Sequence, residues 1–150
     1  MFKSIVVPVD GSDYAAKAVA VASEFVEKHE AKLTLLHVMH RHGSARVPPG
    51  FTEYAKLEHL EVTEHDFFMA LSAQILNKAE RRMQELGVAP SAKETLVGDP
   101  GHMIAEYANE HGADLIVMGC RGLSDLKGLL LGSVSHKVSH LANCACMLVK

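Results

Sequence analysis

Residues 5–12 read IVVPVDGS, and this stretch decides the fold because it joins a buried strand directly to a helix. Ile5 to Val9 form a continuous apolar run, which is typical of a strand buried on both faces of a sheet. The run stops sharply at Asp10 and Gly11. Ser12 can then cap a helix from residue 13 to about residue 29, in which apolar residues recur at helical spacing. We therefore predict a strand that turns straight into a helix, the basic unit of an α/β protein.

The same alternation of strand and helix continues along the chain. Further strands are expected over residues 33–38, 93–97, 115–118 and 146–149, and helices over about 53–86, 100–112 and 133–141. The part of 53–86 before Asp66 is interpreted as a separate short helix. We predict one α/β domain over residues 1–150, with a mostly parallel sheet covered by helices on both faces. Ligands of such sheets bind beyond the carboxyl ends of the strands, where Asp10, Val38 and Gly119 each end a strand.

The long helix before Gly87 has one apolar face. Its side chains recur at three- and four-residue spacing, namely Phe68, Leu71, Ile75, Ala79, Met83 and Leu86. Gly87 is well placed as the C-terminal stop of this helix.

Composition excludes two classes of protein. The formal net charge is −3 and aromatic residues make up 5% of the chain, so the basic and base-stacking surface of a nucleic-acid binder is missing. No apolar stretch approaches the roughly 20 residues that span a bilayer, and the start lacks the long apolar region of a signal peptide. We expect a soluble, cytoplasmic protein with no membrane insertion, whose 3 cysteines stay reduced.

The strongest local signal is the segment 119–133, GCRGLSDLKGLLLGS, which we call the glycine loop. It runs from a strand end into a helix start, and its glycines let a ligand approach bare backbone. The helix N-terminus offers unpaired amides and a partial positive charge, which together favour an anion such as phosphate. Ser133 is expected to cap this helix or to offer its hydroxyl to a phosphate, beside the amides of Val134 and Ser135 and the cation of Arg121. The alternative is that the glycines form ordinary turns and Ser133 is only a cap.

Two common nucleotide signatures are missing, since the sequence has neither the Gly-Lys of a Walker A loop nor a Gly-x-Gly dinucleotide fingerprint. Instead, the pattern G-x2-G-x9-G-S over 119–133, together with IVVPVDGS, LLHV, ADLIVMG and the ending CACMLVK, resembles the universal stress protein family, specifically its ATP-binding branch. The resemblance spans essentially the whole chain. It implies a Rossmann-like, open five-stranded parallel sheet in the order 3-2-1-4-5 with helices on both faces, commonly in a homodimer joined through the last strand. Ala145 and Cys146 depart from the family pattern, in which a proline and an aliphatic residue are frequent.

The resemblance also implies a nucleotide-binding site. Adenosine would lie at the end of the first strand, formed by Pro8, Val9 and Asp10, where Asp10 is suited to a ribose hydroxyl or, through water, to a metal ion. The backbone of Val38 would pair with adenine, and Met118 would flank the nucleotide. The phosphate cradle would comprise Gly119, Gly122, Gly132, Ser133, Val134 and Ser135. The phosphate role of Arg121 is our own inference from its place between the glycines.

By this resemblance we expect a cytoplasmic regulatory protein of the stress response whose signal is ATP binding. Mg²⁺ or Mn²⁺ would be bound through the phosphates, because triphosphate charge must be neutralised. The expected partner is a transporter, an enzyme or another stress protein. No Walker lysine, nucleophile elbow or carboxylate pair is evident, so at most slow ATPase activity is expected. The alternatives are a slow ATP-hydrolysing or phosphotransfer enzyme, a nucleotide-free dimeric scaffold, and AMP or cyclic AMP as the real ligand.

The histidines give weaker hypotheses. His136 and His140 lie four residues apart on the last helix, but no third ligand is identifiable and a zinc site is not favoured. Residues 40–42, HRH, are interpreted as a solvated loop, with a pH-sensitive rim of the site as the alternative. His37 lies inside a predicted strand and is expected to be a core residue with a hydrogen-bond partner.

The cysteines also favour structural roles. Cys120 lies beside Arg121 in the glycine loop, where redox sensing is a weaker hypothesis than a small loop residue. Cys144 and Cys146 would point to one face of a strand with Cα atoms about 6.5–7 Å apart, at or beyond the disulfide limit. We expect both to be small core or edge residues.

Overall fold

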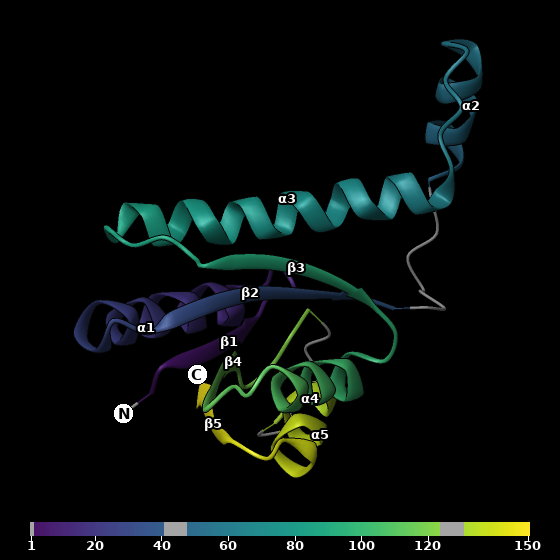
Figure 1. Cartoon of the computed structure of the whole chain (residues 1–150). Helices are drawn as coiled ribbons and strands as arrows, with labels where there is room; N and C mark the ends of the chain where they lie inside the picture. The colour runs from purple at the N-terminus through teal and green to yellow at the C-terminus, as the bar shows by residue number, and fades with distance from the viewer. Residues whose placement is uncertain (1, 41–47, 124–130) are drawn as a thin grey trace.

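The computed structural model describes residues 2–40, 48–123 and 131–150, and it shows a sheet with helices on both sides (Figure 1). In chain order the elements are β1 (Ser4–Pro8), α1 (Asp13–His29), β2 (Lys32–Met39), α2 (Pro49–Leu57), α3 (Glu64–Glu85), β3 (Ala92–Val97), α4 (Pro100–Glu110), β4 (Leu115–Gly119), α5 (Ser133–Leu141) and β5 (Ala145–Val149). The separate short helix predicted before Asp66 is α2. Among the described residues, no helix is long and apolar enough to cross a membrane.

The strands of the described chain form one parallel sheet in the order β3-β2-β1-β4-β5, which confirms the predicted order. β1 lies in the centre, with Val7 in register with Leu35 of β2 and Val6 in register with Ile116 of β4. β1 ends at Pro8, one residue earlier than predicted. The reason is that the chain leaves the sheet in a turn through Gly11, whose φ of +84° is the left-handed region that glycine favours.

Both faces of the sheet are buried. One face carries Ile5 and Val7 and packs against α1 and α3, while the other carries Val6 and packs against α4 and α5. Figure 1 shows α3 on one side of the sheet and α4 and α5 on the other. Because successive side chains of a strand point to opposite faces, only a continuous apolar run satisfies a central strand covered on both sides.

Side chains fix where several helices begin and end. The Ser12 hydroxyl accepts a hydrogen bond from the Ala15 amide at 3.2 Å, so Ser12 caps α1 as predicted. A carboxylate oxygen of Asp99 accepts from the His102 amide at 3.1 Å and caps α4. Gly87 follows the end of α3 with a φ of +80°, which confirms it as the stop.

The face of α3 that meets the sheet differs from the prediction. Leu71 and Leu86 were placed on the same apolar face as Ala79 and Met83, but they are 44% and 42% exposed. The buried positions of α3 are Ser72, Leu76, Ala79 and Met83. Ser72 reaches β3, where its hydroxyl lies 2.7 Å from that of Thr95. A buried serine held by a hydrogen bond does not contribute to an apolar pattern, so the periodicity misplaced the edge of this face.

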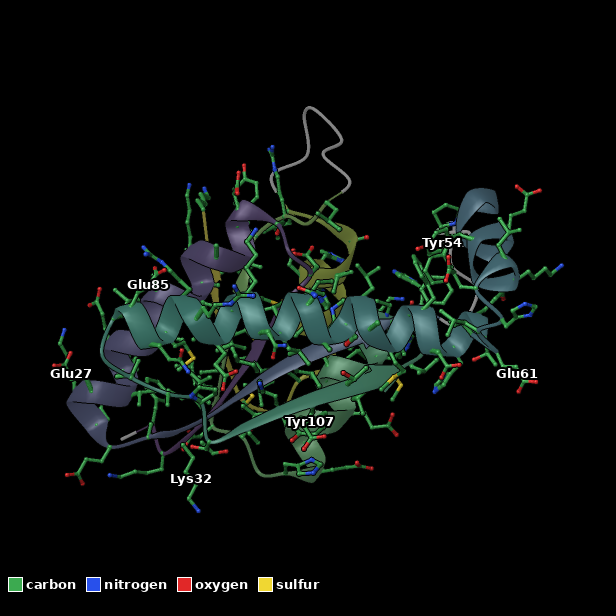
Figure 2. The ribbon with its side chains drawn as sticks, turned by 90° about the horizontal axis from the view of Figure 1, so that it is seen from above. Glu27, Lys32, Tyr54, Glu61, Glu85 and Tyr107 are labelled. Carbon is green, nitrogen blue, oxygen red and sulfur yellow. The ribbon has the colours of Figure 1, made fainter. Side chains whose placement is uncertain are left out.

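α2 is loosely attached to the rest of the molecule. Figure 2 shows Tyr54 of α2 near one end of α3, with Glu85 at the other end. Phe51 contacts Phe67 of α3 with ring centroids 5.0 Å apart. Among the α2 side chains that the structure describes, Ala55 is the buried one. The helix therefore adds little to the core.

Candidate functional site

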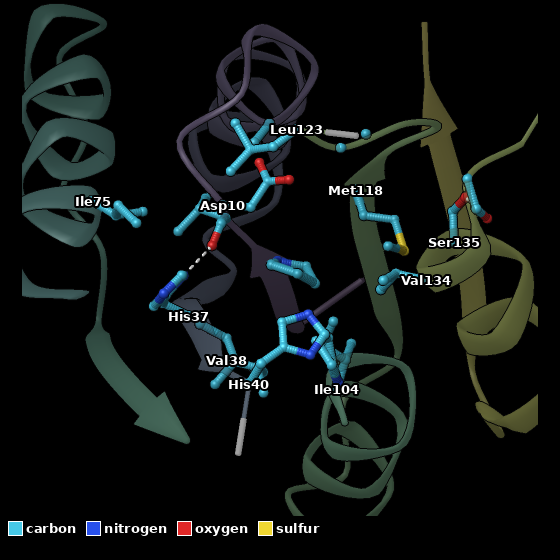
Figure 3. A pocket seen from close by; sticks show the side chains of 18 of the residues that line it. Asp10, His37, Val38, His40, Ile75, Ile104, Met118, Leu123, Val134 and Ser135 are labelled. Carbon is cyan, nitrogen blue, oxygen red and sulfur yellow. Dashed lines mark hydrogen bonds between the residues drawn. The ribbon is translucent and has the colours of Figure 1, made fainter. Parts of the chain in front are cut away.

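A cavity of about 530 Å³ lies at the carboxyl ends of β1, β2 and β4, between α3 and the starts of α4 and α5 (Figure 3). This volume is typical of a small-molecule site, for which roughly 300–1,000 Å³ is usual. Every residue predicted for the nucleotide site lines the cavity: Pro8, Val9, Asp10, Val38, Met118, Gly119, Arg121, Gly122, Gly132, Ser133, Val134 and Ser135. The sheet topology thus brings three strand ends and the starts of two helices together.

The backbone of β2 is bare in the cavity wall, because its neighbour β1 has already ended. The Val9 amide donates to the Leu36 carbonyl at 2.8 Å, so the backbone groups of Leu36 point toward β1. Backbone direction alternates along a strand, and the amide and carbonyl of Val38 therefore point the same way. No described residue hydrogen-bonds to either group. Val38 presents one donor and one acceptor side by side to the cavity.

Next to this bare backbone, the imidazole of His37 holds the end of β1. Its Nδ1 lies 2.7 Å from the carbonyl oxygen of Val9, the contact dashed in Figure 3. A carbonyl oxygen only accepts, so Nδ1 carries the proton and donates. His37 has the predicted partner, but it is half-buried in the cavity wall rather than in the core. His40 also lines the cavity, whereas Arg41 and His42 lie outside the described residues.

Asp10 places a half-buried carboxylate in the cavity wall. Its Oδ1 accepts a hydrogen bond from the Ser12 amide at 2.9 Å. A Cβ atom on Gly122 would lie 2.7 Å from Oδ2, so Gly122 approaches the carboxylate this closely only because it has no side chain. Within the described ranges, Asp10 is the single Asp or Glu that lines the cavity, and no cluster of three or more His, Cys, Asp or Glu side chains occurs.

The two ends of the glycine loop are fastened to each other. The Gly132 amide donates to the Cys120 carbonyl at 2.7 Å, and the Ser135 hydroxyl donates to the same oxygen at 2.9 Å. Ser135 is 2% exposed and Cys120 is 3% exposed. The Ser135 hydroxyl is thus engaged inside the protein, and the Cys120 thiol is not presented to solvent as redox sensing would require. Gly128, the remaining glycine of the loop, lies outside the described residues.

The start of α5 corrects one prediction. The N-cap is Gly132, which has no side chain to offer, and Ser133 is the first helical residue, so Ser133 does not cap the helix. The reason is geometric: Gly132 holds the extended conformation before the first turn, with φ −72° and ψ 158°. The first amides of a helix have no partner within it, and here those of Ser133 and Val134 lie at the cavity. The exposed Ser133 hydroxyl has no hydrogen-bond partner among the described residues.

The geometry agrees with comparisons to known proteins. The model of the universal stress protein family matches residues 1–150. The chain belongs to the universal stress protein family. It is 36% identical to universal stress protein YxiE of Bacillus subtilis, with 100% of both chains covered.

Solved structures of the family have the same fold. UspA from Lactobacillus plantarum has a TM-score of 0.73 and 28% identity, with 99% of this chain and 98% of that chain covered. A universal stress protein solved in complex with cyclic AMP has a TM-score of 0.70 and 27% identity, with 99% and 97% covered. These relatives match this universal stress protein over nearly its whole length.

Sequence reasoning missed one wall of the cavity. Phe68, Leu71 and Ile75 of α3 line it, although their spacing predicted only that they share one apolar face of the helix. Ile104 of α4 lies on the opposite side of the cavity from Ile75 (Figure 3). Helical periodicity shows that a face is covered, but the same pattern arises whether a sheet or a ligand covers it. No local signal separated these two cases.

The remaining cysteines and histidines take structural positions. Cys144 and Cys146 pack partly buried against the core on the α4 and α5 face, as predicted. Desolvation by burial raises the pKa of both thiols. The rings of His136 and His140 lie 4.5 Å apart on α5, and His140 Nδ1 lies 3.0 Å from the His136 carbonyl oxygen. The described residues supply no third ligand for a zinc site there.

Proposed function

We propose that this universal stress protein binds ATP in the cavity and acts as a nucleotide-dependent regulatory protein of the stress response. One observation carries the proposal. The same cavity holds a free backbone donor and acceptor at Val38, a carboxylate at Asp10 and an uncapped helix start at Ser133. These three features match the base, the ribose and the phosphates of a nucleotide.

The base would bind at Val38. The Val38 amide can donate to N1 of adenine, while its carbonyl accepts from the 6-amino group. Ile75 and Ile104 approach from opposite sides and offer apolar surface to the two faces of the ring (Figure 3). Pro8, Val9 and Met118 complete this part of the wall.

The ribose and phosphates would extend toward α5. Asp10 can accept from a ribose hydroxyl through Oδ2, because Oδ1 already accepts from the Ser12 amide. The amides of Ser133 and Val134 and the positive end of the α5 dipole would bind phosphate oxygens. Arg121 lines the same cavity and adds a positive charge. Mg²⁺ or Mn²⁺ would be bound by the phosphates, and Asp10 would contact the ion through water.

The cyclic AMP complex of a 27% identical relative supports an adenine nucleotide as the ligand. AMP or cyclic AMP is therefore the second candidate. Competition titrations separate these ligands, because loss of the β- and γ-phosphates weakens binding only if the start of α5 is used fully. ATP displaced equally well by AMP would favour the second candidate.

We propose that ATP is retained rather than turned over rapidly. Asp10 is the one carboxylate among the described lining residues, and its Oδ1 is already engaged. Proton transfer in hydrolysis needs a positioned acid or base. The rival is a slow ATP-hydrolysing or phosphotransfer enzyme, which predicts metal-dependent turnover that disappears in Asp10→Ala.

Assembly and partners are part of the proposal. β5 forms an edge of the sheet, and such an edge is a template for pairing with a second copy of the chain. We propose a cytoplasmic homodimer joined through β5, whose ATP-bound form is read by a transporter or an enzyme. Light scattering at tens of micromolar tests the dimer, and a monomer would contradict it.

The first experiment is to purify the full chain without added nucleotide, denature it and identify released small molecules by chromatography and mass. Release of ATP from the wild type, but not from Gly132→Val, is expected. Thermal unfolding of Gly132→Val is the control for folding, since a Cβ at residue 132 would meet its nearest neighbours at an ordinary 3.4 Å. An empty wild-type protein that also ignores added ATP would favour the nucleotide-free dimeric scaffold.

A further inference from the structure

The bare backbone of Val38 depends on an interruption of the parallel ladder. Pro8 is in register with Leu36, so continued pairing would set Asp10 opposite Val38. In a regular parallel ladder the Val38 amide would then donate to the Val9 carbonyl. That bond is not formed in the described structure, although the preceding bond from the Val9 amide to the Leu36 carbonyl is.

A side chain already donates to the oxygen that the Val38 amide would use, and anchors that oxygen outside the regular ladder. His37 Nδ1 donates to the Val9 carbonyl at 2.7 Å. The backbone of His37 itself points to the other neighbour, because its register partner is Thr95 of β3 and the next odd residue, Met39, accepts from the Gly98 amide at 2.8 Å. His37 thus satisfies the first carbonyl after β1 without using its own backbone or that of Val38.

We propose that His37 is a positioning residue for the nucleotide base, which keeps the Val38 amide free by holding the Val9 carbonyl. The contact with the base rests on the proposed function, whereas the effect of His37 on the backbone of Val9 and Val38 does not. Without the imidazole, the Val9 carbonyl is left without its partner. An unpaired carbonyl is costly, so the Val38 amide turns to it and is lost to the ligand.

The other ring nitrogen offers a competing role. With Nδ1 protonated, the neutral ring leaves Nε2 as an acceptor. No buried side-chain nitrogen or oxygen of the described chain lacks a partner, and Nε2 forms no hydrogen bond, so Nε2 is accessible from the cavity that His37 lines. Direct contact of Nε2 with the ligand is therefore the outcome that the test must separate from positioning through Nδ1.

Three substitutions separate the two roles. His37→Leu removes both nitrogens. His37→Asn keeps a donor near the position of Nδ1, and His37→Gln keeps a polar group near the position of Nε2. Affinities for ATP and ITP are measured for each full-length variant after removal of bound nucleotide, with thermal unfolding as the control for folding.

ITP is the informative comparison because its base presents a donor at N1 and an acceptor at position 6, the reverse of adenine. The wild type is expected to prefer ATP. In His37→Leu, ATP affinity should fall about tenfold, near the upper limit for one net hydrogen bond, while ITP affinity hardly changes. A purely structural role would lower both affinities together. His37→Asn should restore the preference for ATP, and His37→Gln should not.

The opposite pattern, in which His37→Gln keeps the preference for ATP and His37→Asn loses it, would overturn positioning in favour of direct contact. Unchanged selectivity in all three variants would overturn it as well.

A second readout needs no nucleotide: amide hydrogen exchange of Val38, followed by NMR in the empty protein. Exchange should be fast in the wild type and His37→Asn and slower in His37→Leu. If wild-type protein binds no ATP while this exchange pattern holds, the proposed function fails and the backbone role of His37 stands.

Discussion

The two ends of the glycine loop use the same residue type for different physical purposes. At the β4 end, a Cβ atom on Gly119 would lie 2.7 Å from Tyr14 Cβ and 2.9 Å from the Tyr14 backbone carbon, so the missing side chain lets α1 approach. At the α5 end, Gly132 has φ −72° and an added Cβ would meet nothing closer than 3.4 Å. The fold requires glycine at residue 119, whereas only a ligand would require it at residue 132. A glycine pattern therefore mixes packing and binding constraints that the structure separates.

The largest expected effect is a loss of stability at Gly119, where the missing side chain lets α1 pack closely. Gly119→Ala sets a methyl group against the backbone of α1 beside Tyr14, which cannot move without shifting the helix. Overpacking of this kind costs about 3 kcal/mol of unfolding free energy, measured by urea denaturation. An average substitution costs about 1 kcal/mol of unfolding free energy. A value for Gly119→Ala within about 0.5 kcal/mol of the wild type would show that α1 does not pack closely against residue 119.

An intermediate effect is expected at Gly122, which lies between Gly119 and Gly132 in the sequence. Gly122→Ala would press on Asp10 Oδ2 and displace a side-chain carboxylate rather than backbone. We expect a loss of about 1–2 kcal/mol of stability, smaller than at residue 119 because a side chain yields more easily. ATP affinity should fall as well, measured by calorimetry, because Asp10 is moved from the proposed ribose contact. A variant that loses stability but keeps full affinity would remove Asp10 from the site.

The ligand end should respond in the opposite sense. Gly132→Ala should leave the unfolding free energy unchanged, since its methyl fits at ordinary contact distance. The methyl fills the gap between the two ends of the loop, so ATP affinity should fall about tenfold, equal to about 1.4 kcal/mol. If Gly132→Ala and the wild type have equal denaturation midpoints but unequal ATP affinities, residue 132 serves binding and residue 119 serves packing. A stability loss in Gly132→Ala as large as that of Gly119→Ala would contradict this distinction.

The smallest effect concerns α4, which lies outside the loop. Asp99 caps this helix, and its carboxylate also accepts a hydrogen bond from Lys137 of α5 at 3.0 Å. The bond from Lys137 is the largest cause that lowers the pKa of Asp99 from 3.8 to about 2, and the bond from the His102 amide is the second. Asp99→Ala should cost about 1 kcal/mol at neutral pH, as loss of an N-cap does. A lowered folded pKa stabilises above the unfolded value. The difference between variant and wild type should therefore fade as pH drops from about 4 toward 2.

The control for this prediction is Glu106→Ala, a substitution at an exposed residue of the same helix whose side chain has no partner in the described structure. Its stability should follow the wild type across the same pH range. Acid unfolding monitored by circular dichroism measures both variants. A constant difference between Asp99→Ala and wild type down to pH 2 would contradict the lowered pKa.

Much of the fold could be predicted because its signals are local. The apolar run of residues 5–9, the Ser12 cap and the Gly87 stop each depend on a few neighbouring residues and fixed element boundaries nearly correctly. The sheet order was predicted through the family resemblance rather than from these signals. The packed face of α3 was placed only in part, because the hydrogen-bonded Ser72 belongs to it while the apolar Leu71 does not.

The candidate site was predictable at the level of residues that gather, since all those assigned to it line one cavity. Their roles were less predictable. Ser133 was expected to cap α5 or to offer its hydroxyl to a phosphate. The first alternative is wrong, because Gly132 holds the cap position and a cap is defined by backbone angles rather than by a suitable side chain. His37 was expected in the core, yet it stands in the cavity wall.

The alternation of strands and helices, the buried central strand and the glycine-rich entry to the last helix could all be derived from the sequence alone. Hydrophobic periodicity, helix capping and the backbone freedom of glycine depend on residues close together in the sequence, so a short stretch is enough to predict them. Only the tertiary structure decided that Phe68 of α3 faces a cavity, that Gly119 serves packing and Gly132 does not, and that His37 meets the Val9 carbonyl. These outcomes depend on which distant segment arrives opposite each residue, and that is set by register and helix placement across the whole sheet.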